Sequence, residues 1–220
     1  GGTAVQRALT QRWTADNLSA GYYDKYADRF EQMFGGPHGQ IVDWLKAHAV
    51  TADIRHVIEL GCGDGRALAA MAERIPEIEG WTGVDINAEI IARNQDTFAD
   101  RHDLDFIAAD ATEWLANHAG PGTLLMTFGG VMEYMAPETL KTWFRLLAEK
   151  QGAGVLLLEP IDPKHDLASD PASHIWGWED TYSHNHRALL EKAGYRIVKA
   201  DEADFLKYRF IMMLAAPVTS

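Results

Sequence analysis

The sequence predicts a doubly wound α/β fold, in which helices cover both faces of a seven-stranded, mostly parallel sheet. Five short apolar runs, each typical of a strand buried on both faces, alternate with segments whose apolar residues repeat at helical spacing. After the fifth run the order changes to one helix and two consecutive strands, which indicates an antiparallel edge. The five apolar runs are residues 57–60, 81–84, 104–108, 124–128 and 155–158.

Helices are predicted between these runs. One has an apolar face that ends before Pro76, and another begins near Pro137, a residue favoured in the first turn of a helix. The residues of these two faces are Ala67, Leu68, Met71, Ile75, Leu140, Trp143, Phe144 and Leu147. The last helix is predicted over residues 183–193, and the last two strands over residues 196–200 and 207–215.

Length and composition favour one domain without nucleic-acid or membrane partners. The chain has 220 residues, of which 47% are hydrophobic, and this is enough for one core. Its net charge of −12 disfavours a phosphate-backbone partner. The single cysteine, Cys62, excludes an internal disulfide framework, and no apolar run approaches the roughly 20 residues of a membrane span. We expect a cytoplasmic protein with an N-terminal helical cap region over residues 1–50 and a core over residues 51–220.

The stretch from Val57 to Gly65, VIELGCGDG, joins a predicted strand to a glycine-rich turn before a helix. Such a turn presents backbone N–H groups and lets a ligand come close to the backbone. The glycines follow the pattern G-x-G-x-G, and Arg66 stands at the sixth place, where dinucleotide enzymes favour glycine. Glu59 would repel a pyrophosphate but suits a ligand with an ammonium group. The pattern therefore favours an amino-acid-like ligand over NAD.

The segment 59–65 resembles the first motif of class I S-adenosylmethionine-dependent methyltransferases, and the resemblance covers roughly residues 20–215. In that family an acid after the second strand holds the ribose hydroxyls, and an acid after the third meets the adenine amino group. Asp85 and Asp110 stand at these places. Glu59 or Asp110 could instead be a helix cap or a surface acid. The resemblance implies a Rossmann-like methyltransferase fold and S-adenosylmethionine as cofactor. The cofactor-binding residues that it implies are Glu59, Gly61, Gly63, Asp85, Ile86, Asp110, Ala111, Phe128 and Tyr22.

The segment after the fourth strand narrows the kind of methyltransferase. Residues 127–130, TFGG, lack the D/N/S-P-P-Y/F/W motif of base-amine and glutamine-amide methylases, and also the acids with which aminopropyltransferases bind a polyamine. Metal-dependent catechol-type enzymes carry an aspartate after strand four and Asp-Asn after strand five. This chain has Thr127 and Glu159-Pro160 there, so we expect no metal. What remains resembles the small-molecule methyltransferases, whose loose Y-D-x-x-A start is similar to residues 22–27.

Two further segments supply candidates for the acceptor side. Residues 159–182 have no convincing helix or strand pattern, and a loop there is positioned to wall the acceptor pocket. Its tryptophans can stack on an acceptor or anchor the loop to the core. A second set of aromatic residues repeats at helical spacing over residues 22–34, which favours a packed helix face. The acceptor-side candidates are Tyr23, Tyr26, Trp176, Trp178 and Tyr182, and the catalytic candidates are Glu133, Tyr134, His165 and His174.

We therefore expect an enzyme that transfers a methyl group from S-adenosylmethionine to an oxygen or nitrogen of a small, aromatic or heterocyclic molecule. The reaction is an in-line displacement, which needs a base only when the acceptor atom holds a proton. Two alternatives stay open. The chain could methylate a protein side chain or terminus, or it could be a methyltransferase-like subunit that binds the cofactor without catalysis.

Overall fold

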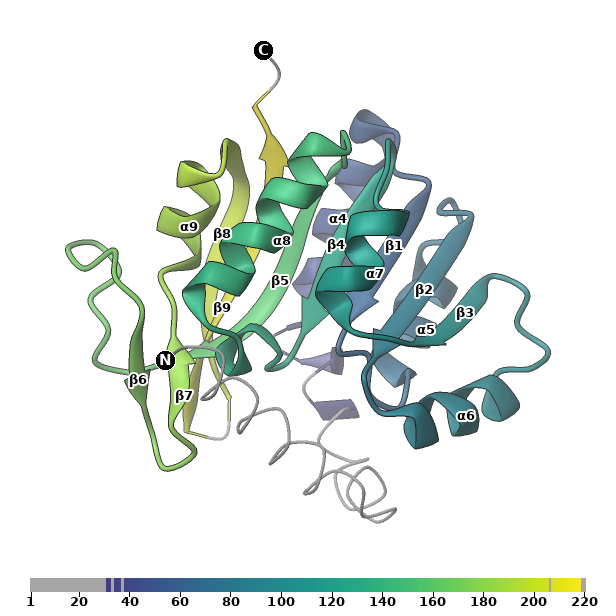
Figure 1. The fold of residues 1–220 in the computed structure, drawn as a ribbon, viewed down its shortest axis with the longest axis horizontal. Coiled ribbons are helices and arrows are strands. Elements are labelled where there is room, and N and C mark those ends of the chain that lie inside the picture. Colours follow the sequence, from purple (N-terminus) through teal and green to yellow (C-terminus); the bar gives the residue numbers. More distant parts are fainter. Residues whose placement is uncertain (1–30, 33, 37, 206, 219–220) are drawn as a thin grey trace.

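The computed structural model describes residues 31–32, 34–36, 38–205 and 207–218, and it contains a seven-stranded sheet (Figure 1). The strand order is β3-β2-β1-β4-β5-β9-β8, in which the first five strands are parallel and β9 is antiparallel to both of its neighbours. This arrangement confirms the predicted fold class. The strands are β1 (His56–Leu60), β2 (Gly80–Asp85), β3 (Leu104–Ala108), β4 (Thr123–Phe128), β5 (Gly154–Ile161), β8 (Tyr195–Phe205) and β9 (Tyr208–Pro217).

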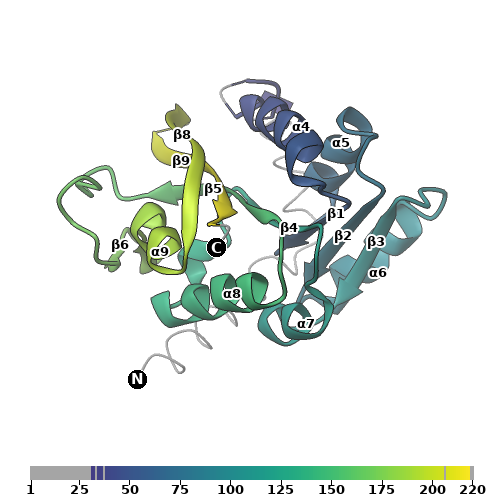
Figure 2. The same ribbon diagram turned by 90° about the horizontal axis from the view of Figure 1, so that it is seen from above.

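Helices pack on both faces of this sheet, and each face has its own hydrophobic cluster (Figure 2). The helices of one face are α4 (Gln40–Ala52), α5 (Arg66–Arg74) and α6 (Ala88–Thr97), and those of the other are α7 (Ala111–His118), α8 (Pro137–Glu149) and α9 (His186–Lys192). The apolar residues predicted to face the sheet around α5 and α8 are all buried. No helix in the described part of the chain is long and apolar enough to cross a membrane.

The fifth strand is longer than the sequence predicted, because β5 continues through Pro160 to Ile161. Proline lacks the N–H that a strand with two neighbours needs. The pairing of β4 with β5 ends where Phe128 faces Leu158, whereas Pro160 is paired only on its other side, with Phe210 of β9. The proline is therefore tolerated because it stands where the strand has one neighbour.

The prediction of a patternless segment over residues 159–182 was wrong in part. Besides the end of β5, it contains most of a small antiparallel hairpin made of β6 (His174–Trp176) and β7 (Thr181–Ser183), which forms a separate two-stranded sheet. Strands of three residues are too short to produce a readable alternation. The helix predicted from residue 183 begins later, because the Asn185 side chain accepts the N–H of Ala188 and caps α9.

Part of the predicted N-terminal region lies outside the described residues, including Tyr22, Tyr23 and Tyr26. Phe34, the last aromatic residue of that pattern, is described and buried. Its ring lies 5.6 Å from that of Phe128 at the end of β4, measured between centroids. At this position the pattern therefore marks a packed residue. The single-domain organisation stays a prediction.

Candidate functional site

The glycine turn after β1 brings two loops into contact. Gly61, Gly63 and Gly65 have φ angles of +68°, +52° and +76°, in the left-handed region that favours glycine. The N–H of Gly61 donates to the carbonyl of Val84 at 2.8 Å. A Cβ on Gly61 would lie only 2.7 Å from a methyl carbon of Val131, which follows β4. The missing side chain therefore lets the loops after β1 and β4 approach each other at the carboxyl edge of the sheet.

Replacing Gly61 with alanine is expected to lower the free energy of unfolding by about 2–5 kcal/mol. The strain of a left-handed alanine costs about 1–2 kcal/mol, and the overlap with Val131 adds about 1–3 kcal/mol. Denaturant unfolding of Gly61→Ala measures this loss. The control is Gly120→Ala, because a Cβ there meets no atom of the described residues within 4 Å. Equal stability of the two variants would contradict the proposed close approach.

Asp85 ends β2 and supports the glycine turn. Its side chain is only 8% exposed, and its two oxygens accept the N–H groups of Gly63 at 3.0 Å and Asn87 at 2.9 Å. Burial raises the pKa of this carboxyl group, and the N–H donors oppose that shift. Each carboxylate oxygen has a second lone pair, so the group retains capacity to accept a pair of hydroxyls. Ile86 follows with half of its surface exposed, and it offers an apolar contact beside the carboxylate.

Glu59 carries a buried oxygen that lacks a partner. The residue lies in β1 with 2% of its surface exposed, and its Oε2 makes no hydrogen bond to any residue that the structure describes. Burial, followed by the charges of Asp64 and Asp85, raises the pKa of Glu59 well above its usual value. Burying a charge without a partner is costly, so a cationic group at this oxygen would offset a real penalty. This orphaned atom fits a ligand that carries an ammonium group.

Asp110 and Ala111 follow β3 at the same edge of the sheet. Oδ1 of Asp110 accepts the N–H of Glu113 at 3.0 Å, so the residue caps α7, as the sequence allowed. Asp110 is exposed, and Ala111 is half-buried at the first position of the helix. The cap occupies one carboxylate oxygen and leaves the residue facing solvent. Contact with a ligand at Asp110 stays a prediction.

Two glutamates lie close together at the segment after β4, one within the segment and one on β5. Glu159 of β5 is fully buried, and its carboxylate oxygens accept the N–H groups of Met132 at 3.0 Å and Val131 at 3.1 Å. Glu133 lies in the short helix η1 (Met132–Tyr134). Burial raises the pKa of Glu159 to about 7, and burial with the charge of Glu159 raises that of Glu133 to about 8. The pair therefore holds a proton near neutral pH. Glu159 was not among the site residues predicted from the sequence.

The β6–β7 hairpin is anchored to this same segment. The hydroxyl of Tyr134 donates to Glu179 at 3.2 Å, between the two hairpin strands. His184, directly after β7, lies with its Nε2 3.0 Å from the carbonyl of Met132 and 3.1 Å from that of Met135. Burial lowers the pKa of His184 to about 4, so the ring is neutral and its Nε2–H donates to both carbonyls. These hydrogen bonds connect the segment after β4 to the hairpin that follows β5.

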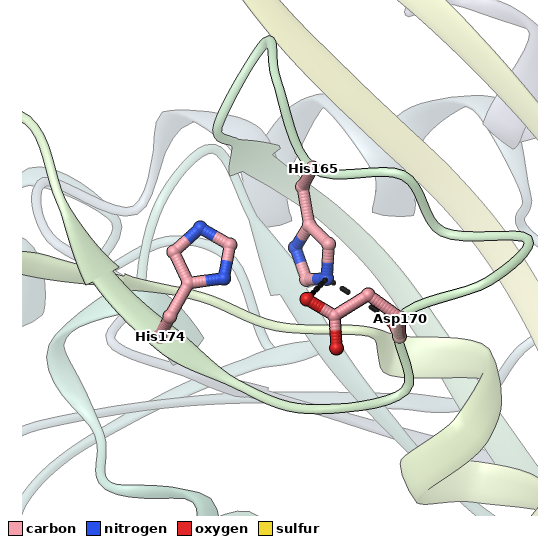
Figure 3. A group of neighbouring side chains, drawn as sticks. All are labelled: His165, Asp170 and His174. Carbon is pink, nitrogen blue, oxygen red and sulfur yellow. Dashed lines mark hydrogen bonds and ion pairs between the residues drawn. The ribbon is translucent and has the colours of Figure 1, made fainter.

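The remaining acceptor-side and catalytic candidates differ in how exposed they are and in what they contact. Trp178 is 76% exposed, whereas Trp176 is half-buried. Tyr182 is also half-buried and stacks on the ring of His184, with centroids 5.4 Å apart. His165 and His174 lie together, with ring centroids 4.6 Å apart, next to Asp170 (Figure 3). No pattern in the sequence indicated that these two histidines would meet.

One family profile and several known protein sequences are similar to this chain, and the profile covers the segment that contains the glycine turn. The profile of the family described as "Methyltransferase domain" matches residues 57–150, which extend from β1 to the end of α8. The trans-aconitate 2-methyltransferase of Rhodopseudomonas palustris (strain BisA53) is 28% identical over 149 residues, which cover 68% of this chain and 53% of that protein. The protein of the same name from Acidovorax sp. (strain JS42) is 26% identical over 70% of each chain. The match thus spans about half the length of the first relative.

A solved structure shares the fold. The magnesium protoporphyrin IX methyltransferase from Synechocystis PCC 6803, crystallised with bound S-adenosylmethionine, superposes with a TM-score of 0.62. The match covers 96% of this chain and 97% of that one at 18% identity. The sheet order, the glycine turn and the matched family profile lead to one conclusion. Residues 57–150 carry a methyltransferase domain, and the chain has the fold of the class I S-adenosylmethionine-dependent methyltransferases.

Proposed function

We propose that this protein transfers the methyl group of S-adenosylmethionine to an oxygen or nitrogen of a small aromatic or heterocyclic molecule that is neutral or cationic. The glycine turn and the residues around it support the donor half of this proposal. Asp85 has free acceptor capacity for the two ribose hydroxyls, and Ile86 offers apolar surface for the adenine. The orphaned oxygen of Glu59 suits the ammonium group of the methionine part. In this arrangement we expect Asp110 and Ala111 to contact the adenine.

The observation that carries the acceptor half is the pair of glutamates at the segment after β4. With its pKa raised to about 8, Glu133 is present in both protonation states near neutral pH, as a general base requires. Glu159 holds the backbone of the same segment, and its charge strengthens the affinity of Glu133 for a proton. We therefore assign to Glu133 the removal of a proton from the acceptor atom.

The acidic side chains around the segment after β4 disfavour an anionic acceptor. Glu133, Glu159 and Glu179 are all acidic, and the only Lys or Arg between residues 159 and 186 is Lys164, which is exposed. A tricarboxylate would meet repulsion here, because like charges in a partly buried site cannot be screened well. We therefore expect an acceptor other than the one named for the trans-aconitate relatives. Tyr134, Trp176 and Tyr182 supply aromatic surface on this side.

Transfer of a radiolabelled methyl group tests the function. The chain is incubated with labelled S-adenosylmethionine and a cell extract, which is then separated by molecular size, and heat-inactivated chain serves as the control. We expect label in the small-molecule fraction, and we expect panels of phenols and amines to accept it while trans-aconitate does not. Label in protein would favour the side-chain alternative. Cofactor binding without any transfer would favour the non-catalytic one.

A further inference from the structure

Two histidines and two aspartates meet between the end of β5 and the β6–β7 hairpin. One possible ligand atom each from His165, Asp170 and His174 lies within 4.8 Å of the others. Figure 3 shows the His165 ring and the Asp170 carboxylate facing each other, with the His174 ring beside them. Nε2 of His174 is also 3.0 Å from Oδ2 of Asp162. The fold thus gathers two imidazoles and two carboxylates from one continuous stretch of the chain, residues 162–174.

Two of the distances in this cluster are close to those of shared coordination. Two ligand atoms bound to one zinc ion at about 2 Å and at the tetrahedral angle lie roughly 3.3 Å apart. Nε2 of His165 is 3.8 Å from Oδ2 of Asp170, and the His174–Asp162 pair is separated by 3.0 Å. Binding would draw together the ligand atoms of His165, Asp170 and His174, which lie within 4.8 Å of one another, and Asp162 would join through its contact with His174.

Ser183 contacts the second ring nitrogen of His165, as hydrogen-bonding groups commonly do for histidines that bind a metal ion. The His165 ring is fully buried, and its Nδ1 lies 2.8 Å from Oγ of Ser183. The same oxygen accepts the N–H of Asp162 at 3.0 Å. A histidine whose Nδ1 is fixed by an oxygen directs its Nε2 toward a metal ion. Ser183 therefore orients two of the four candidate ligands at once.

We infer that His165, Asp170 and His174, with Asp162, bind one divalent cation of the zinc type. Mixed imidazole and carboxylate ligands suit zinc and its neighbours among the transition metals, whereas calcium and magnesium prefer oxygen alone. Two carboxylates neutralise the charge of the ion. The ion is structural, which departs from the sequence-based expectation that the chain takes no metal.

The ion would stabilise the segment that carries the acceptor side. Ser183 ends β7, and the next residue, His184, is bonded to the carbonyls of Met132 and Met135. Fixing the loop through His165 and His174 therefore also fixes the hairpin against the segment after β4. We expect bound metal to raise the thermal stability of the whole chain.

The test uses the untagged full-length chain, treated with chelator and desalted, then titrated with zinc chloride in a calorimeter. We expect one ion per chain, and visible absorption bands of a four-coordinate site when cobalt(II) replaces zinc. His174→Ala and Asp170→Asn should each weaken zinc binding at least ten-fold, because both residues are half-buried and can be changed without opening the core. The control His118→Ala alters an exposed histidine stacked on Trp114 and should bind zinc normally.

Melting curves provide the second readout. Zinc should raise the melting temperature of the wild type and of His118→Ala, but not that of His174→Ala or Asp170→Asn. The inference is overturned if the wild type shows no saturable binding, or if all variants bind zinc equally. In either case the cluster is a hydrogen-bonded anchor of the loop, in which Nε2 of His165 pairs with the carbonyl of Asp170, 3.2 Å away.

Discussion

Replacing Asp85 with alanine is expected to weaken binding of S-adenosylhomocysteine at least ten-fold, which corresponds to about 1.4 kcal/mol. The variant removes the carboxylate that we assign to the ribose hydroxyls. It also leaves the N–H groups of Gly63 and Asn87 without their acceptor, so the glycine turn loses support. Calorimetric titration of both proteins measures the change. Asp96→Ala, an exposed acid on α6, is the matched control and should bind like the wild type.

A change in the ligand separates the two roles of Asp85. An S-adenosylhomocysteine analogue that lacks the ribose 2′-hydroxyl should bind the wild type more weakly than the parent compound does. It should lose little further affinity in Asp85→Ala, because the acceptor of that hydroxyl is already gone. Equal losses in the two proteins would mean that Asp85 supports the turn without contacting the ribose.

Glu133→Gln is expected to lower kcat about 100-fold or more with an acceptor that must lose a proton, because glutamine cannot act as a base. The affinity for S-adenosylmethionine should stay unchanged, since Glu133 lies on the acceptor side. Steady-state kinetics of Glu133→Gln and of the control Glu138→Gln, an exposed residue of α8, test this. An unchanged kcat in Glu133→Gln would remove the residue from proton transfer.

The pH dependence of the rate follows from the raised pKa of Glu133. A base must be ionised to act, and protonation increases as the pH falls below its pKa of about 8. For the wild type, kcat/KM should therefore rise about ten-fold per pH unit below that value and level off above it. Glu133→Gln should lose this rise. A profile that instead levels off above pH 6 would assign the proton to a histidine with an ordinary pKa.

The fold was predictable because its signals are local. Strands of a parallel sheet buried on both faces produce continuous apolar runs, so β1 to β4 were located to within one residue at each end. Asp85 could be placed for the same reason, since it stands directly after such a run. The end of β5 was missed, because the single-sided pairing that tolerates Pro160 depends on where β4 stops.

The acceptor side was less predictable because its contacts are not local. Glu159 binds N–H groups almost thirty residues earlier in the chain, and nothing near it in sequence indicates this. His165 and His174 meet only because the β6–β7 hairpin folds back, and its three-residue strands leave no period to detect. Trp178, which resembles Trp176 in sequence context, is exposed to solvent. Which aromatic residue faces the acceptor depends on that hairpin.

A crystal structure of the chain with S-adenosylhomocysteine would test the assigned cofactor site. We expect one cofactor molecule at the carboxyl edge of β1 and β2, above the glycine turn. The ribose hydroxyls should lie within hydrogen-bonding distance of the Asp85 carboxylate, and the amino group should face Oε2 of Glu59. Electron density for the cofactor at another edge of the sheet, or an Asp85 carboxylate turned away from the ribose, would contradict the assigned cofactor site.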